Sequence, residues 1–169
     1  VLYVLTMSLV KDGRVLHTVS KRVGFRTVEF RPQDGIYVNG VKIVMKGVNR
    51  HCFHPESGRT TSAAIDLEDA LLIKQMNANA VRSHYPPDAR FLDYCDSLGI
   101  FYLDELAGWH GHYDTEVGGK LVREMIRRDV NHPCILIWNN GNEGGWNTDL
   151  DSMFYELDPQ GRHVIHPWA

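Results

Sequence analysis

The sequence predicts an α/β protein, the N-terminal half of a (β/α)8 TIM barrel preceded by the last strands of an immunoglobulin-like β-sandwich. From about residue 36, short apolar segments alternate with amphipathic helical segments, a rhythm that indicates a parallel sheet. Residues 1–30 instead contain alternating segments around a turn at residues 11–14, which is typical of antiparallel strands. We therefore expect two parts, residues 1–30 at the end of a sandwich and residues 31–169 as the first half of a barrel.

Local signals place the individual elements. An Asn39-Gly40 turn predicts a hairpin over residues 36–42. Apolar runs predict strands at residues 42–46, 78–82, 100–103, 134–138 and 164–166. Helical spacing predicts helices at residues 67–76, 89–98, 119–130 and 149–157, the second closed by Gly99. About four and a half strand–helix units follow, whereas a closed barrel needs eight. An open doubly wound sheet is the rival, but the turn at residues 47–51 lacks its Gly-rich phosphate loop.

Composition limits the class of protein. The chain has 169 residues, 43% of them hydrophobic, and a net charge of −3, which fits a soluble domain and argues against nucleic acid as a partner. No apolar run approaches the roughly 20 residues that cross a bilayer, so no membrane partner is expected. Cys52, Cys95 and Cys134 are odd in number and widely spaced, so we expect reduced thiols and no disulfide framework or zinc knuckle.

The chain begins without Met and without a signal peptide. We expect it to be a piece of a longer protein, truncated at both ends. The sequence leaves the cytoplasm and the periplasm open as locations, and it leaves open whether the complete protein is a homo-oligomer.

Residues 135–143 carry the strongest functional signal. An apolar strand ending at Trp138 leads to Asn142 and Glu143, and the carboxyl ends of parallel strands are where α/β proteins bind ligands. An acid, an amide and the neighbouring indoles of Trp138 and Trp146 fit a sugar site. The alternative is that Glu143 caps the following helix.

Each predicted strand ends in polar residues, which predicts one functional rim. Glycoside hydrolysis normally uses two carboxyl groups, and spacing makes Glu105 and Glu143 candidates for that pair. Because they follow neighbouring strands, they could equally be a hydrogen-bonded support pair. Arg50 or Arg82 could form structural ion pairs beneath the site.

The chain resembles glycoside hydrolase family 2, the family of β-galactosidases, β-glucuronidases and β-mannosidases. Six segments carry the resemblance, in the family's order: 47–51 (GVNRH), 79–86 (NAVRSHYP), 94–100 (YCDSLGI), 104–105 (DE), 129–133 (DVNHP) and 138–143 (WNNGNE). The resemblance implies a β-sandwich followed by a catalytic (β/α)8 barrel. It also implies a retaining β-glycoside hydrolase that cleaves terminal β-linked sugars, with β-galactosidase activity favoured.

The resemblance also implies roles for individual residues. Glu143 is the general acid/base of a double displacement, and Asn142 binds the sugar 2-hydroxyl. His84, Arg50 and Asp104 shape the pocket. Glu105 is a supporting carboxylate, because the family's nucleophile is a second Glu that matches no position here and is expected beyond this chain. The isolated chain is then expected to be inactive.

Three departures from the family pattern bear on the site. Only Ser83 separates Arg82 from His84, where the family usually has two residues, and Asn139 replaces a Ser or Gly. The loop at residues 106–112 lacks the carboxylate of the metal-dependent galactosidases, and its His110 and His112 alone make a weak hard-cation site. We therefore expect no metal and no cofactor. Trp109, in that loop, is a candidate sugar platform, with ordinary packing as the alternative.

A non-catalytic carbohydrate-binding module is the main competing function, since it needs the aromatic pocket but no nucleophile. A doubly wound binding domain is disfavoured by the missing phosphate loop.

Overall fold

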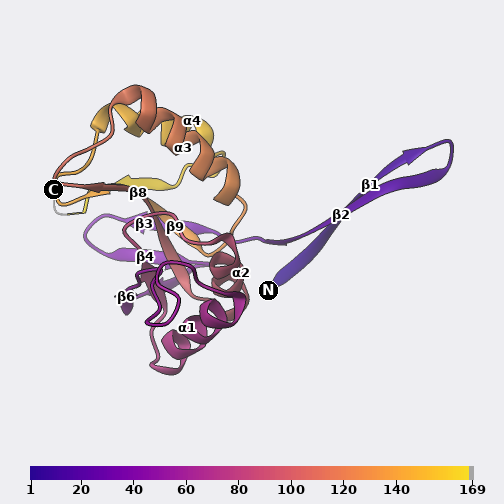
Figure 1. The fold of residues 1–169 in the computed structure, drawn as a ribbon, viewed down its shortest axis with the longest axis horizontal. Coiled ribbons are helices and arrows are strands. Elements are labelled where there is room, and N and C mark those ends of the chain that lie inside the picture. Colours follow the sequence, from indigo (N-terminus) through magenta and orange to yellow (C-terminus); the bar gives the residue numbers. More distant parts are fainter. Residues whose placement is uncertain (168–169) are drawn as a thin grey trace. The chain divides into compact units, whose positions relative to one another are not determined.

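The computed structural model describes residues 1–167, and residues 168–169 lie outside the described part. The chain divides into two compact units, Val1–Ile43 and Val44–Ala169 (Figure 1). The first is built from antiparallel strands, and the second alternates strands and helices.

The first unit opens with a long hairpin. Strand β1 (Leu2–Lys11) pairs antiparallel with β2 (Arg14–Gly24), and the register shifts at a bulge between Leu9 and Val10. Asp12 and Gly13 connect them with φ values of 50° and 74°, as in a type I′ turn, whose twist suits a two-residue hairpin. The hairpin predicted around residues 11–14 is therefore confirmed.

The rest of the first unit is a three-stranded antiparallel sheet of β3 (Val28–Arg31), β4 (Gly35–Val38) and β5 (Val41–Ile43). The predicted Asn39-Gly40 turn joins β4 to β5, with Asn39 at φ 52°. Because β5 is hydrogen-bonded to β4, the expectation that residues 42–46 form the first barrel strand was wrong. The two compact units divide after Ile43, and the expected domain boundary near residue 30 stays a prediction.

The second unit contains five parallel strands in sequential order, as a curled barrel sheet requires. Its strands are β6 (Gly47–Asn49), β7 (Ala80–Arg82), β8 (Phe101–Trp109), β9 (Ile135–Asn142) and β10 (His163–Ile165). Helices α1 (Ala63–Gln75), α2 (Ala89–Leu98), α3 (Thr115–Asp129) and α4 (Asp151–Leu157) connect them, with a 3-10 turn at Thr148–Leu150 before α4. The predicted four and a half units of a (β/α)8 barrel are confirmed.

Local capping explains where the helices begin and end. Ser62, Asp88 and Asp114 cap α1, α2 and α3 by accepting a hydrogen bond from a backbone N–H of the first turn. Helix α2 ends as predicted at Gly99, which has a left-handed φ of 67°. The cap at Asp114 starts α3 at Thr115, earlier than the expected residue 119.

A single hydrophobic cluster joins the sheet to all four helices, which places the helices on one face of the sheet. In Figure 1, α1 lies beside α2 and α3 beside α4, and both pairs are in contact. The largest buried side chains of the cluster are those of Trp138, Tyr102, Phe91 and Phe154. The cysteines are free, as expected, with Cys95 and Cys134 buried.

None of the helices found in residues 1–167 combines the length and the apolar character that a membrane crossing needs.

Candidate active site at the carboxyl ends of β7, β8 and β9

A buried polar network links the ends of three neighbouring strands. Arg82 at the end of β7 donates from Nε to Glu105 Oε2 over 2.7 Å and from its second terminal nitrogen to Asn142 Oδ1 over 2.6 Å. Asn139 of β9 donates to the same Glu105 oxygen over 2.9 Å. Glu105 and Asn139 are directly opposite each other in the β8–β9 register, so the network holds the strands in register and orients Asn142.

Several polar atoms beside this network have no hydrogen-bond partner within the described chain. They are Glu105 Oε1, His84 Nδ1 and Asn142 Nδ2, all shielded from solvent, and the first two are 3.8 Å apart. Burial raises the pKa of Glu105, although its hydrogen bonds with Asn139 and Arg82 oppose the shift. Unsatisfied buried groups are costly, and a hydroxyl-rich ligand would satisfy an acceptor and a donor here together.

An aromatic wall adjoins these polar atoms. The imidazoles of His51 and His84 stack with ring centroids 4.9 Å apart and an interplanar angle of 11°. Trp109, which is 44% exposed, lies 6.1 Å from His84 and 6.3 Å from Tyr85, centroid to centroid. Burial, Arg82 and His51 lower the pKa of His84, while Glu143 opposes the shift, so a neutral imidazole is favoured near pH 7.

Glu143 occupies a strained turn directly after β9. Its φ is +48° and that of Gly144 is +79°, and the backbone N–H of Gly145 donates to the carbonyl of Asn142 over 2.8 Å. These are the features of a type I′ turn, which Gly, Asn and Asp favour and a Glu side chain does not. Such strain is concentrated at functional sites. The Glu143 side chain is 37% exposed, so it is open to a ligand.

Close backbone contact holds this turn against the end of β8. A Cβ atom on Gly108 or Gly141 would overlap the carbonyl oxygen of Gly145, and one on Gly145 would overlap the backbone of Gly108. The turn and the end of β8 therefore touch main chain to main chain, which only glycine permits. The contact ties the position of Glu143 to that of β8.

Two of the predicted site residues, Arg50 and Asp104, face the helices and not the candidate site. Arg50 is 7% exposed and donates to Asp66 and Asp69 of α1, so it is the structural ion pair left open as an alternative. Asp104 is fully buried on the helix side of β8, where burial and the adjacent Asp129 raise its pKa well above the usual range. The expectation that Arg50 and Asp104 shape the pocket was wrong.

Trp138 also lies outside the candidate site. Its side chain is fully buried in the core, and its indole N–H donates to Asp158 over 2.9 Å. A sugar cannot stack on this ring, so the expectation for Trp138 was wrong. Trp138 and Asp104 are paired across β8 and β9, and both point to the helix side because neighbours in register share a face.

The structure brings the other predicted residues, Asn142, His84, Glu105 and Trp109, together near Glu143. It adds His51 and Tyr85, which the sequence reasoning did not select. Tyr85 Oη accepts a hydrogen bond from the backbone N–H of Cys52 over 3.0 Å, so it joins the two loops. The available signal was that both residues lie in polar segments after predicted strands, His51 after residues 42–46 and Tyr85 after residues 78–82.

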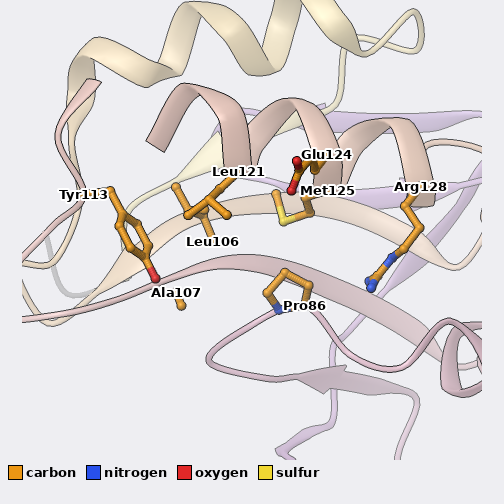
Figure 2. Close-up of a pocket in the computed structure, with 8 residues that line it drawn as sticks. All are labelled: Pro86, Leu106, Ala107, Tyr113, Leu121, Glu124, Met125 and Arg128. Atoms are coloured by element: carbon orange, nitrogen blue, oxygen red, sulfur yellow. The ribbon is translucent and has the colours of Figure 1, made fainter. Parts of the chain in front are cut away.

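A separate cavity of about 320 Å³ lies on the helix side of β8. In Figure 2, Leu121, Met125 and Arg128 extend toward β8 from α3, and Tyr113 and Arg128 lie at opposite ends of the cavity. Leu106 lines it, whereas the adjacent Glu105 faces the polar network. Because successive strand residues point to opposite faces, this cavity and the candidate active site lie on opposite sides of the sheet.

Within residues 1–167, one group of three potential metal ligands was found, Asp96, His132 and Cys134. The Asp96 carboxylate accepts from His132 Nδ1 over 2.6 Å and from the backbone N–H of Cys134 over 2.8 Å. These bonds tie α2 to the start of β9, at the end of the strands opposite Glu143. Hydrogen bonding between these residues therefore explains why they lie together.

The profile described as "Glycosyl hydrolases family 2, TIM barrel domain" matches residues 28–120 and 110–160. The chain belongs to this family. This family 2 chain is 34% identical to a β-galactosidase of Lactococcus lactis. The match covers 90% of this chain and 16% of that protein. It is 39% identical to a β-galactosidase of Vibrio cholerae, over 85% of this chain and 15% of that protein.

Solved structures of the family agree with the fold. The β-glucuronidase of Bifidobacterium dentium, solved with coumarin-3-O-glucuronide, matches with a TM-score of 0.87 and 29% identity, covering 98% of this chain and 30% of that one. The family 2 chain therefore spans less than a third of the length of each of these relatives.

Proposed function

We propose that this chain carries the acid/base part of the active site of a retaining β-glycoside hydrolase. The observation that supports this most is the position of Glu143, held in a strained turn beside the unpartnered polar atoms of Asn142, Glu105 and His84. A carboxyl group that moves protons must lie next to the groups that hold the substrate. The relatives' names, β-galactosidase and β-glucuronidase, agree with this class of reaction.

In the proposed mechanism, Glu143 protonates the glycosidic oxygen as its bond to the sugar breaks. The resulting carboxylate then removes a proton from the water that attacks the covalent glycosyl-enzyme intermediate. Asn142 Nδ2 is free to donate to the 2-hydroxyl, because Arg82 occupies Oδ1 and so orients the amide. Trp109 provides an exposed ring on which an apolar sugar face can stack.

Glu105 is proposed as a supporting carboxylate and not the nucleophile. Arg82 and Asn139 both donate to its Oε2, which weakens that oxygen as an attacking group. Its free Oε1 lies 3.8 Å from His84 Nδ1, where the two atoms can share a sugar hydroxyl. The nucleophile is then supplied by a part of the full-length protein beyond this chain, and the isolated chain should not turn over.

We further propose a β-galactoside as the favoured substrate, on the resemblance to the galactosidases. A panel of aryl β-galactoside, β-glucuronide, β-mannoside and β-glucoside tests this directly. The highest kcat/KM on the galactoside would support this substrate assignment. A higher kcat/KM on the glucuronide would make a β-glucuronide the substrate, and the proposed role of Glu143 would stay the same.

The deciding experiment replaces Glu143 with Gln in the full-length protein. The amide keeps the size of the side chain but cannot transfer a proton, so kcat on the preferred aryl glycoside should fall by about 10²- to 10⁴-fold. Glu116→Gln, an exposed position in the first turn of α3, is the matched control and should retain full turnover. Unchanged turnover in Glu143→Gln contradicts the proposal.

The same pair of variants tests the alternative, a carbohydrate-binding module. A module without hydrolysis binds the sugar equally well with Glu143 or Gln and releases no aglycone in either form. Calorimetric titration with the free sugar, run beside the turnover assay, separates the two functions.

A further inference from the structure

Two strained turns face each other at Glu143. His110, in the loop after β8, has a φ of +58°, and the backbone N–H of Gly111 donates to the carbonyl of Trp109 across it. A positive φ is rare for a His residue and costs free energy. Glu143 has the same kind of strain in the opposite loop. Each turn thus presents one polar, non-glycine side chain in an unfavourable backbone conformation.

Contacts between the two loops join these strained residues. The backbone N–H of His110 donates to the carbonyl of Glu143 over 3.2 Å. The His110 Nε2 atom lies 3.6 Å from Glu143 Oε2. The Gly108–Gly145 contact lies directly beside them. The main chain and the side chain of His110 therefore both contact Glu143, beside a close backbone contact.

We propose that His110 is a positioning residue for Glu143, and this inference rests on the proposed acid/base role of that residue. As Glu143 gives its proton to the glycosidic oxygen, negative charge develops on its carboxylate. Before the reaction, His110 Nε2 and Glu143 Oε2 are too far apart for a hydrogen bond. As the charge develops, the N–H at Nε2 moves within hydrogen-bonding distance of Oε2 and donates to it. Catalytic hydrogen bonds commonly tighten only when the reacting complex forms.

The geometry also explains why the His110 imidazole affects proton donation by Glu143 and not sugar binding. His110 is 79% exposed, and its contact is with Glu143 Oε2, whereas Arg82 and Asn139 bind Glu105 and not Glu143. Loss of the imidazole leaves the hydroxyl-binding network intact. The effect should therefore depend on how much the leaving group needs a proton, and not on the sugar.

The test uses His110→Asn in the full-length protein. Asn tolerates a left-handed backbone but is too short to reach Glu143, so the fold is kept and the contact is lost. For an aryl glycoside with a poor leaving group such as phenol, kcat/KM should fall about tenfold, a fraction of what general acid catalysis contributes. For the dinitrophenyl glycoside, which leaves without a proton, it should change by less than about twofold.

Two further variants make the result specific. His112→Asn alters the neighbouring exposed histidine of the same loop and should change neither substrate. His110→Gly, whose backbone accepts the positive φ without strain, should repeat the leaving-group selectivity of His110→Asn. An equal loss on both substrates, or no loss on either, overturns the proposal.

Glu143→Gln measured on the same two substrates separates this inference from the proposed function. If Glu143→Gln loses the phenyl substrate selectively and His110→Asn does not, Glu143 is the acid and His110 has no part in positioning it. If Glu143→Gln shows no selectivity either, the acid/base assignment fails, and the role of His110 fails with it.

Discussion

Arg82 is the residue on which the candidate site depends most. It is 18% exposed, and its guanidinium binds Glu105 on one side and Asn142 on the other. A planar fork suits these two acceptors at once, and the single ammonium of a Lys does not. The residue thus supports a buried carboxylate and also aims the amide next to Glu143.

We predict that Arg82→Lys lowers the free energy of unfolding by about 2–4 kcal/mol, because it leaves a buried carboxylate poorly paired. Urea denaturation of the full-length protein measures this. Arg90→Lys is the control, since Arg90 is 46% exposed and pairs with Asp88, and it should cost less than about 0.5 kcal/mol. Equal stability of the two variants would show that the fork is dispensable.

Asp104 contributes a pH dependence that has nothing to do with catalysis. Burial and the adjacent Asp129 raise its folded-state pKa well above 3.8. As pH rises above 3.8, the unfolded chain releases this proton while the folded chain retains it. Stability therefore decreases with rising pH until the folded pKa is reached.

Asp104→Asn should remove this contribution of Asp104 to the pH dependence of stability. The amide oxygen can still accept from the backbone N–H of Glu105, as Asp104 Oδ1 does over 3.0 Å, and the amide N–H₂ can donate to Asp129. The variant should gain Tm relative to the wild type, and the gain should grow between about pH 4 and pH 7. Thermal melts across that range test it, with exposed Asp149→Asn as the control; a gain independent of pH would be inconsistent with this account.

At the scale of the elements, the decisive feature is the contact between the end of β8 and the turn after β9. The strands are long, and their ends stay paired as far as Trp109 and Asn142. Near that point Gly108 of β8 and Gly141 of β9 both approach Gly145, which follows β9, and so bring the backbones together. The loop carrying Glu143 is therefore positioned by an adjacent strand and not only by its own turn.

Gly108→Ala should reduce turnover by at least about tenfold, because the added methyl overlaps Gly145 and displaces the Glu143 turn, and small misplacements at a reacting group are costly. Gly111→Ala, three residues further along the chain and just after β8, is the matched control, since its Cβ would approach no closer than 4.0 Å to Trp109 O. The measurement is kcat on the preferred aryl glycoside. A fully active Gly108→Ala would mean that the loops can shift without moving Glu143.

At the scale of the whole molecule, the two units differ in how they bury apolar surface. The second unit has one continuous core. The β1–β2 hairpin instead exposes large apolar side chains on both faces, including Val4, Leu5, Leu9 and Leu16. A two-stranded hairpin has no core of its own, and exposed apolar patches favour association.

The 169-residue chain on its own should therefore bind a hydrophobic dye or self-associate. Replacing Leu5 and Leu9 with Lys should lower dye fluorescence, whereas replacing the exposed polar Ser8 and Thr18 with Lys should not, because only the first pair removes apolar surface. Dye titration with light scattering measures both. A monomeric chain that binds no dye would count against the expectation.

The fold was predictable where the signals are local. The predicted bounds of helix α2, residues 89–98, agree with the structure, because the Gly99 that ends the helix is a local signal next to its last residue. Strands β8 and β9 extend further than expected, to Trp109 and Asn142. Polar residues therefore lie within these strands, Asp104 and Glu105 in β8 and Asn139 in β9. Neighbouring strands and helices supply hydrogen-bonding and charged partners for these side chains, and no local sequence pattern reveals those partners.

The sequence by itself determined the order of strands and helices, the family, and the place of Glu143 after an apolar strand. Only the tertiary structure decided which side of the sheet each polar residue faces. Arg50, Asp104 and Trp138 turn to the helices, while His51 joins the site. The physical reason is that a strand sends successive side chains to opposite faces, and only the partners across the sheet show which face is the core.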